Sequence, residues 1–160
     1  MATLSPVLPG SPRKIHVRVV HTRTDFTERA LRGVLMALHT VVAITALYGG
    51  GMLLLNTSGE YLQLPLSMLK GAPFRDYLVP GVLLFLVVGG GNLVASFWLV
   101  GGWRWGPAAS VVAGAFLTGW MVTQILMLGY QAPIQGVFLA LGVVTLALAL
   151  ARAWRRGLEG

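Results

Sequence analysis

The fold is decided by residues 78–100, which read LVPGVLLFLVVGGGNLVASFWLV and contain no charged side chain. In a helix that rises about 1.5 Å per residue, roughly 20 residues cross the hydrocarbon core of a bilayer, which is about 30 Å thick. The stretch is long enough to do so, and its apolar residues form a continuous run. A strand of a membrane barrel would instead alternate apolar and polar residues. The sequence therefore predicts a transmembrane helix.

Three further apolar runs of similar length surround this one, at residues 34–55, 107–128 and 134–151. They belong to a chain of 160 residues, of which 56% are hydrophobic and only 11% are charged, with a mean hydropathy of +0.75. Soluble domains carry about 25% charged residues. We therefore predict an all-α integral membrane protein with four transmembrane helices. The expected spans are about 31–55, 78–100, 107–129 and 133–151.

The connections between the runs differ in length. Residues 101–106 and 129–133 are short enough to force antiparallel neighbours, whereas residues 56–77 form a longer loop with room for a short helix on the bilayer surface. The expected organisation is an N-terminal tail at 1–25, an antiparallel four-helix bundle at 26–152 with an outer loop at 56–77, and a basic C-terminal tail at 153–160.

Basic residues are distributed unevenly about the four runs. Of the twelve Lys and Arg residues, ten lie in the tails and in the turn at 101–106, and only Lys70 and Arg75 lie on the opposite side. Loops rich in Lys and Arg tend to stay in the cytoplasm. We therefore expect both termini in the cytoplasm. The net charge of +7 is explained by topology, and no nucleic-acid partner is expected.

The segment before the first run has two patterns. Residues 1–12 are rich in proline and lack any periodicity, which is typical of a disordered tail. Residues 14–19 alternate apolar side chains with basic or His side chains, as a short strand does. Asp25 and Glu28 have the spacing of a capping box, so a helix is expected to begin near Phe26.

Four polar side chains inside the runs are expected to lie at similar depths in the membrane. At 1.5 Å per residue, His39 and Asn92 lie about 12 Å from the cytoplasmic boundary, Thr118 about 15 Å and Thr145 about 10 Å. An unpaired imidazole or carboxamide in hydrocarbon is costly. We expect one polar layer in which His39 and Asn92 face the bundle interior and pair. They would form either a structural clasp or the polar end of a ligand pocket.

Glycine and small residues recur within the runs. The triplets 49–51 and 89–91 lack the strand and lysine of a phosphate-binding loop, so close helix packing explains them better. The second triplet is expected to favour a kink or a π-bulge beside Asn92. Two other polar side chains, Trp120 and Gln124, lie within the third run.

The outer loop holds a group of residues that continues into the second run. Its members are Pro73, Phe74, Arg75, Asp76, Tyr77 and Pro80. Asp76 is placed to cap the helix that follows, where the helix dipole favours an anion. Recognition of a partner or of a lipid headgroup is the alternative role for this motif.

No catalytic constellation is visible in the sequence. The absence of Cys excludes disulfides, thiolate catalysis and cysteine-bound zinc or iron–sulfur clusters. His39 is the single His within a run, so a haem held by two His side chains lacks its second ligand. The four runs contain no Asp, Glu, Lys or Arg, whereas ion-coupled transporters place such groups near the midplane. We therefore expect no enzymatic activity, no metal site and no cofactor, and an energised transporter is disfavoured.

A resemblance adds to this interpretation. The stretch from Gly71 to Gly81, together with Trp120-x-x-x-Gln124 and Gln135, resembles a recurring group of small bacterial four-span membrane proteins without an assigned activity. More distantly, the chain resembles the DoxX-like four-helix membrane proteins. The resemblance implies a bacterial inner-membrane location and nothing catalytic.

Of two roles compatible with these features, we expect the first and keep the second as the alternative. The first is a structural or accessory subunit, whose partners are membrane lipids and other membrane subunits or copies of itself. The second is a bundle that binds a lipid, a quinone or a pigment in its interior. A fully packed interior favours the first role, and an interior cavity lined by His39, Asn92 or Trp120 favours the second.

Overall fold

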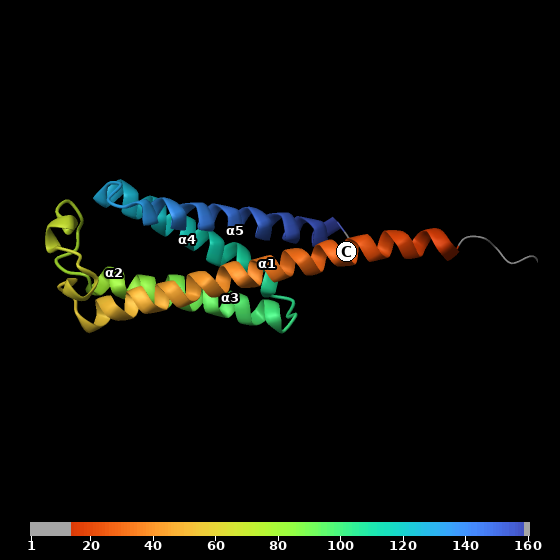
Figure 1. The fold of residues 1–160 in the computed structure, drawn as a ribbon, viewed down its shortest axis with the longest axis horizontal. Coiled ribbons are helices and arrows are strands. Elements are labelled where there is room, and N and C mark those ends of the chain that lie inside the picture. Colours follow the sequence, from red (N-terminus) through yellow and green to blue (C-terminus); the bar gives the residue numbers. More distant parts are fainter. Residues whose placement is uncertain (1–13, 159–160) are drawn as a thin grey trace, which may run out of the picture.

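Helices account for nearly all of the chain in the computed structural model, which describes residues 14–158 and the side chains of residues 26–155 (Figure 1). Two short 3-10 helices lie in the loop between the first two spans. In chain order the elements are α1 (Lys14–Leu55), η1 (Glu60–Leu62), η2 (Leu66–Leu69), α2 (Leu78–Val82), η3 (Leu83–Gly90), α3 (Gly91–Val100), α4 (Gly106–Leu128) and α5 (Pro133–Leu158). Because α2, η3 and α3 follow one another without a break, they form a single span.

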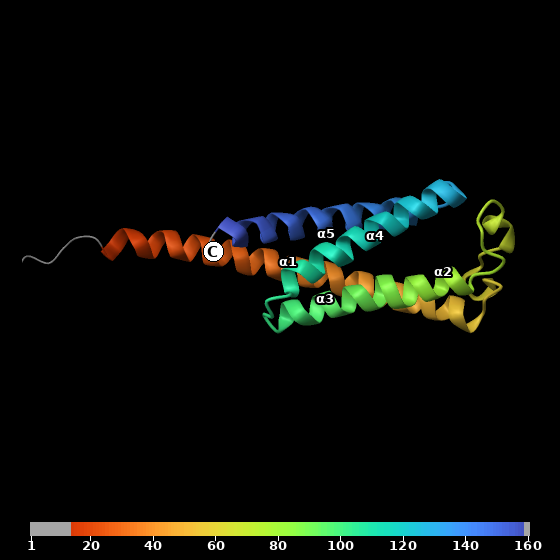
Figure 2. The ribbon, with the colours of Figure 1, turned by 180° about the vertical axis from the view of Figure 1, so that it is seen from behind.

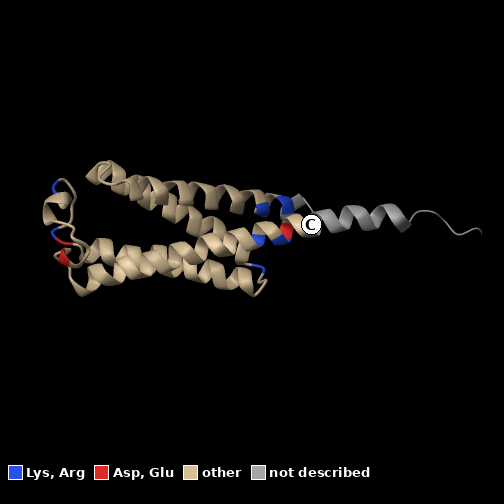
Figure 3. Ribbon diagram, in the orientation of Figure 1, with Lys and Arg blue, Asp and Glu red and all other residues tan. Residues whose placement is uncertain are grey.

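The prediction of an all-helical protein with four membrane-spanning helices is confirmed. Four helical segments are long and apolar enough to cross a membrane: Phe26–Leu55, Leu78–Val100, Gly106–Leu128 and Pro133–Arg155. Large apolar side chains on their outer faces are exposed, with Leu126 exposed by 80% and Ile44 by 63%. Hydrocarbon can solvate such a surface, whereas water cannot. Figure 3 shows that the described Lys, Arg, Asp and Glu residues lie at the two ends of the bundle.

The first helix begins earlier than the sequence predicts. We expected a strand-like segment at residues 14–19 and a helix start near Phe26, but α1 begins at Lys14 and continues unbroken to Leu55. The strand-like prediction is therefore wrong. An isolated strand leaves its backbone groups unpaired, whereas a helix that extends the span satisfies them internally. The tail expected at residues 1–12 lies outside the described residues, as do residues 159 and 160.

The second span contains a π-helix, as the Gly89–Gly91 triplet predicts. The segment η3 covers eight residues, Leu83–Gly90, between the α-helical α2 and α3. A π-helix is wider than an α-helix and holds more residues in each turn, so it shifts the register of the residues that follow it. Asn92 lies directly after this segment.

The helices pack as two groups that diverge. The span formed by α2, η3 and α3 packs along α1, and α5 packs along α4. The groups meet through α3 and α4 and through α1 and α5, whereas α4 contacts η3 only slightly. Figures 1 and 2 show the two groups close together at the end that holds the C-terminus and separated at the end that holds the 56–77 loop. We call these the termini end and the loop end.

Glycines permit the closest helix contacts. A Cβ atom on Gly50 would lie 2.6 Å from the backbone nitrogen of Phe85, and one on Gly89 would lie 2.9 Å from the side chain of Leu47. On the other side of the bundle, a Cβ atom on Gly114 would lie 3.0 Å from the backbone of Leu146. These approaches explain the glycine triplets as packing surfaces.

Two arginines tie the helices together at the termini end. Arg152 in α5 is only 3% exposed, and its Nε atom donates to Glu28 Oε1 in α1 at 2.8 Å. Arg32 in α1 donates to the carbonyl of Val100 at 2.8 Å, which satisfies one of the open carbonyl groups at the end of α3. The termini end is therefore joined by polar contacts as well as by packing.

Candidate functional site

His39 and Asn92 meet in the interior of the bundle. The Nδ1 atom of His39 lies 2.7 Å from Asn92 Oδ1, and the two residues are 0% and 1% exposed. Asn92 also donates from Nδ2 to the carbonyl of Val88 at 2.8 Å. The contact joins α1 to α3 between the termini end and the middle of the bundle.

The hydrogen bonds of Asn92 determine which nitrogen of His39 carries the proton. Because the Asn92 amide donates to Val88, its oxygen faces His39 and can only accept. His39 therefore donates from Nδ1, and Nε2 of the neutral ring is an acceptor. This Nε2 atom is buried and has no partner within the described part of the chain.

The other two members of the expected polar layer do not join this contact. Thr118 donates to the carbonyl of Gly114 at 2.8 Å, so its hydroxyl is satisfied within α4. Thr145 is 1% exposed, and its hydroxyl has no partner among the described residues. The structure thus pairs two of the four residues and leaves the other two separate.

A second polar contact between the same helices was missed from the sequence. Thr40 Oγ1 lies 2.8 Å from Ser96 Oγ, one helical turn beyond Asn92. The signal was the spacing of four residues between Asn92 and Ser96, which places both on one face of the helix. With this contact, α1 and α3 are joined by two consecutive polar pairs.

The loop motif, which consists of residues 73–77 and Pro80, closes the loop end of the bundle. Tyr77 is buried. Its backbone N–H donates to the backbone carbonyl of Thr57, and its hydroxyl donates to the carbonyl of Pro65 at 3.1 Å. Burial raises the pKa of the Tyr77 hydroxyl above its ordinary value, so the phenol keeps its proton. Gly59 has a φ of 83°, in the left-handed region that favours glycine, and a Cβ atom added to it would lie 2.7 Å from the Tyr77 ring.

Asp76 lies one residue before the N-cap position of α2, which Tyr77 occupies. Its Oδ1 atom accepts from the backbone N–H of Leu78 at 3.0 Å, in the first turn of α2. Arg75 and Pro73 are exposed, whereas Phe74 and Pro80 turn inward. The motif therefore combines a side chain that binds the first backbone N–H of α2 with residues that form the wall of a cavity.

The cavity lies at the loop end, where the two helix groups separate. One part, of about 380 Å³, lies under the loop, and a second part, of about 410 Å³, lies between α1 and α5. The two parts have six lining residues in common: Leu62, Leu84, Trp120, Gln124, Ile134 and Gln135. A third hollow, of about 580 Å³, lies between η3 and α4 and also includes Trp120 in its wall. Trp120 is therefore at the junction of all three.

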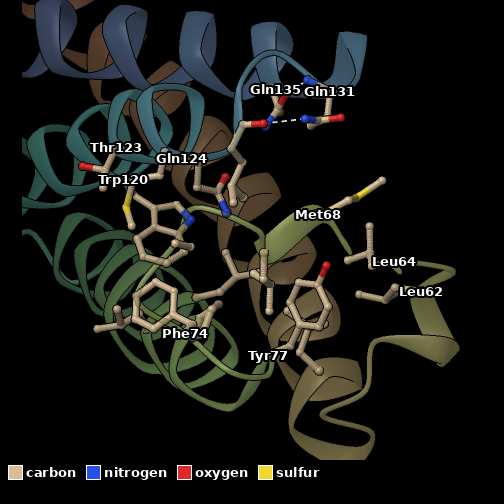
Figure 4. Close-up of a pocket in the computed structure, with 18 of the residues that line it drawn as sticks. Leu62, Leu64, Met68, Phe74, Tyr77, Trp120, Thr123, Gln124, Gln131 and Gln135 are labelled. Carbon is tan, nitrogen blue, oxygen red and sulfur yellow. Dashed lines mark hydrogen bonds between the residues drawn. The ribbon is translucent and has the colours of Figure 1, made fainter. Parts of the chain in front are cut away.

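Trp120 and Gln124 supply the polar groups that remain available in this cavity. Figure 4 shows the Trp120 indole nitrogen and the Gln124 carboxamide pointing into it, whereas Thr123 points away. Trp120 Nε1 is buried without a partner among the described residues. The two residues are four apart in α4 and so lie on one face of the helix.

Two other glutamines at the cavity are already bonded. Gln135 Oε1 accepts from the backbone N–H of Gln131 at 2.7 Å and from that of Ala132 at 3.3 Å. Because Gln135 is at the third position of α5, it reaches back to the open amides as the Gln of a capping box does. Gln131 donates from its side chain to the carbonyl of Leu128.

The residues that line the cavity are all uncharged, and most are aliphatic or aromatic. Within residues 26–155, no group of three His, Cys, Asp or Glu side chains lies close enough together to hold a metal ion. Such a cavity suits an apolar molecule that carries a small number of polar atoms.

No protein-family model, curated protein or solved structure matches this chain.

Proposed function

We propose that this membrane protein binds a lipophilic molecule at the loop end of its bundle. Of the two roles expected from the sequence, this is the second, the binding of a lipid, quinone or pigment. The observation that carries it is the buried Trp120 N–H, which has no partner within residues 26–155 and points into a cavity of uncharged residues. A buried donor without a partner costs about 1 to 3 kcal/mol, and a bound acceptor would remove that cost.

The termini end supports the proposal by contrast. There the buried core of Leu35, Leu99 and Ala149 is continuous, and polar contacts join α1 to α3 and to α5. The loop end uses the same kinds of side chain but leaves partly open space between the helices. This difference favours a binding site at one end, held by a structural scaffold at the other. Contacts with membrane subunits or with further copies of the chain, the first expected role, involve the outer faces and are compatible with such a site.

The test compares what co-purifies with the protein and with a variant whose cavity is filled. The chain is extracted in mild detergent, and its bound molecules are analysed by absorption spectroscopy and by mass spectrometry of an organic extract. Leu84→Trp places a larger side chain at a position that both main parts of the cavity share. Leu93→Trp makes the same change on the exposed face of α3 and serves as the control.

The proposal expects one lipophilic species to be enriched with the native chain and with Leu93→Trp, and lost with Leu84→Trp. If all three proteins yield the same extract, in the proportions of the surrounding membrane lipids, the cavity does not bind a specific molecule.

We also propose a location in the bacterial inner membrane with both termini in the cytoplasm. The support is the excess of basic residues at the termini end over Lys70 and Arg75 at the loop end. Reporter fusions after Gly160 and before Arg13 are expected to report cytoplasm. A periplasmic signal from either fusion rules out this orientation.

A further inference from the structure

The charge of the cavity limits the ligands that it accepts. None of the side chains that line its three parts is an acid, a base or a His. A bound ion would lose its water without gaining a counterion, which costs several kcal/mol. An uncharged molecule carries no such cost.

The hydrogen bonds already made inside the cavity limit the ligand further. The hydroxyl groups of Tyr77 and Thr45 donate to backbone carbonyls, and the oxygen of Gln135 accepts from backbone amides. Among the buried side-chain atoms of the cavity wall that the structure describes, Trp120 Nε1 remains without a partner, and an indole N–H only donates. The ligand must therefore offer an acceptor at this position.

The acceptor atom of the ligand must lie deeper in the membrane than a lipid headgroup does. Trp120 lies eight residues before Leu128, where α4 ends, so its Cα atom is about 12 Å below that end at 1.5 Å per residue. A phosphate at the membrane surface does not reach this depth, whereas a carbonyl further along an uncharged molecule does.

We propose that the ligand is an uncharged lipid whose carbonyl oxygen accepts a hydrogen bond from Trp120 Nε1, beside the carboxamide of Gln124. This inference rests on the proposed function and specifies the chemistry of that same site. An ester carbonyl of a neutral acylglycerol and a ring carbonyl of a quinone share this chemistry.

The experiment uses three probes of similar shape, added to the full chain in nanodiscs of zwitterionic lipid. Methyl decanoate has an uncharged ester carbonyl, decanoate has a charged carboxylate, and undecane has neither group. The protein is labelled with ¹⁵N at tryptophan, and the indole N–H resonance of Trp120 is identified by its loss in Trp120→Phe. Trp154→Phe, at a side chain that is 72% exposed, is the matched control.

The proposal expects methyl decanoate to move the Trp120 indole proton downfield, as a new hydrogen bond does, and undecane to leave it nearly unchanged. Decanoate should bind at least about tenfold more weakly than the ester, because its charge is buried without a partner. Trp120→Phe should weaken ester binding about fivefold, as the loss of one neutral hydrogen bond does. Gln124→Leu should weaken it less, and Trp154→Phe should have no effect.

The outcomes separate the two proposals. If all three probes bind equally and Trp120→Phe binds the ester as the native chain does, the cavity binds lipophiles but the carbonyl assignment is wrong. If decanoate binds best, the ligand is an anion and the charge argument fails. If no probe binds and no species co-purifies, the proposed function itself fails. Where methyl decanoate behaves as proposed, dioctanoylglycerol and a decyl-substituted benzoquinone, measured in the same way, distinguish the two sources of the carbonyl.

Discussion

The pairing of His39 with Asn92 is expected to contribute to stability as a coupled unit. Replacing Asn92 by Leu removes the acceptor for His39 Nδ1 and the donor to the Val88 carbonyl, both at less than 3 Å. Replacing His39 by Leu leaves the Asn92 oxygen without a partner. Hydrogen bonds between membrane helices average about 0.6 kcal/mol and reach about 1.7 kcal/mol. Because both residues are fully buried, we place this one in the upper half of that range, at about 1 kcal/mol.

The measurement is a double-mutant cycle on unfolding in mixed micelles of a mild detergent and dodecyl sulfate, followed by circular dichroism. Asn92→Leu alone should cost about 2 kcal/mol, because it removes two buried hydrogen bonds and leaves His39 Nδ1 without an acceptor. The double variant should then be about 1 kcal/mol more stable than the sum of the two single losses predicts. The free energies of unfolding can be compared only if each single variant is still helical before denaturation.

A second cycle provides the control. Thr118 was expected in the same layer, but its hydroxyl is bonded within α4. His39→Leu and Thr118→Val should therefore add within about 0.5 kcal/mol. Equal coupling in both cycles, or none between His39 and Asn92, would refute the assignment of the pair as a clasp.

Two further predictions concern packing and capping. Gly50→Ala should destabilise the protein by about 1 to 3 kcal/mol, because the added Cβ atom meets the backbone of Phe85. Gly91→Ala should be neutral or slightly stabilising, because its Cβ atom would have no neighbour within 4 Å apart from the adjoining residues and the backbone of its own helix. Thermal unfolding of both variants in detergent decides this, and equal losses would contradict it. Asp76→Ala should cost about 1 kcal/mol, because the N–H of Leu78 loses its acceptor; unchanged stability together with the loss of a co-purifying partner would instead assign Asp76 to recognition.

The four spans were predictable because they depend on the hydropathy of consecutive residues and on the rise per residue of a helix. Hydropathy fixes which residues enter the membrane, and a constant rise per residue gives the depth of each side chain. That is why the predicted spans agree with the helices and why His39 and Asn92 were assigned to one depth. Depth does not give the rotation of a helix about its axis. Thr118 has a similar depth but bonds to its own helix, because a Thr hydroxyl reaches the carbonyl four residues earlier.

The cavity was less accessible to sequence reasoning. Trp120 and Gln124 were recognised as polar residues within a span, but their surroundings depend on how far the two helix groups separate at the loop end. This separation results from side-chain volumes and glycine contacts summed over several helices. The early start of α1 was missed for a different reason. A short alternating pattern describes local propensity alone, and continuation of the adjacent helix outweighs it.

The π-helix has a consequence for how this chain tolerates insertions and deletions. Each residue of an α-helix turns the chain by about 100°. A turn of η3 holds more residues than an α-helical turn, so each of its residues turns the chain by less. If residues 83–90 were wound as a regular α-helix of the same length, every position from Asn92 onward would rotate by roughly the angle of one α-helical residue relative to α2. Asn92 would then leave His39, and Ser96 would leave Thr40, although no hydropathy value along the span would change. The length of residues 83–90 and their π-helical winding are therefore matched to each other. A related chain that lacks one residue there would keep Asn92 opposite His39 by winding the segment as a regular α-helix.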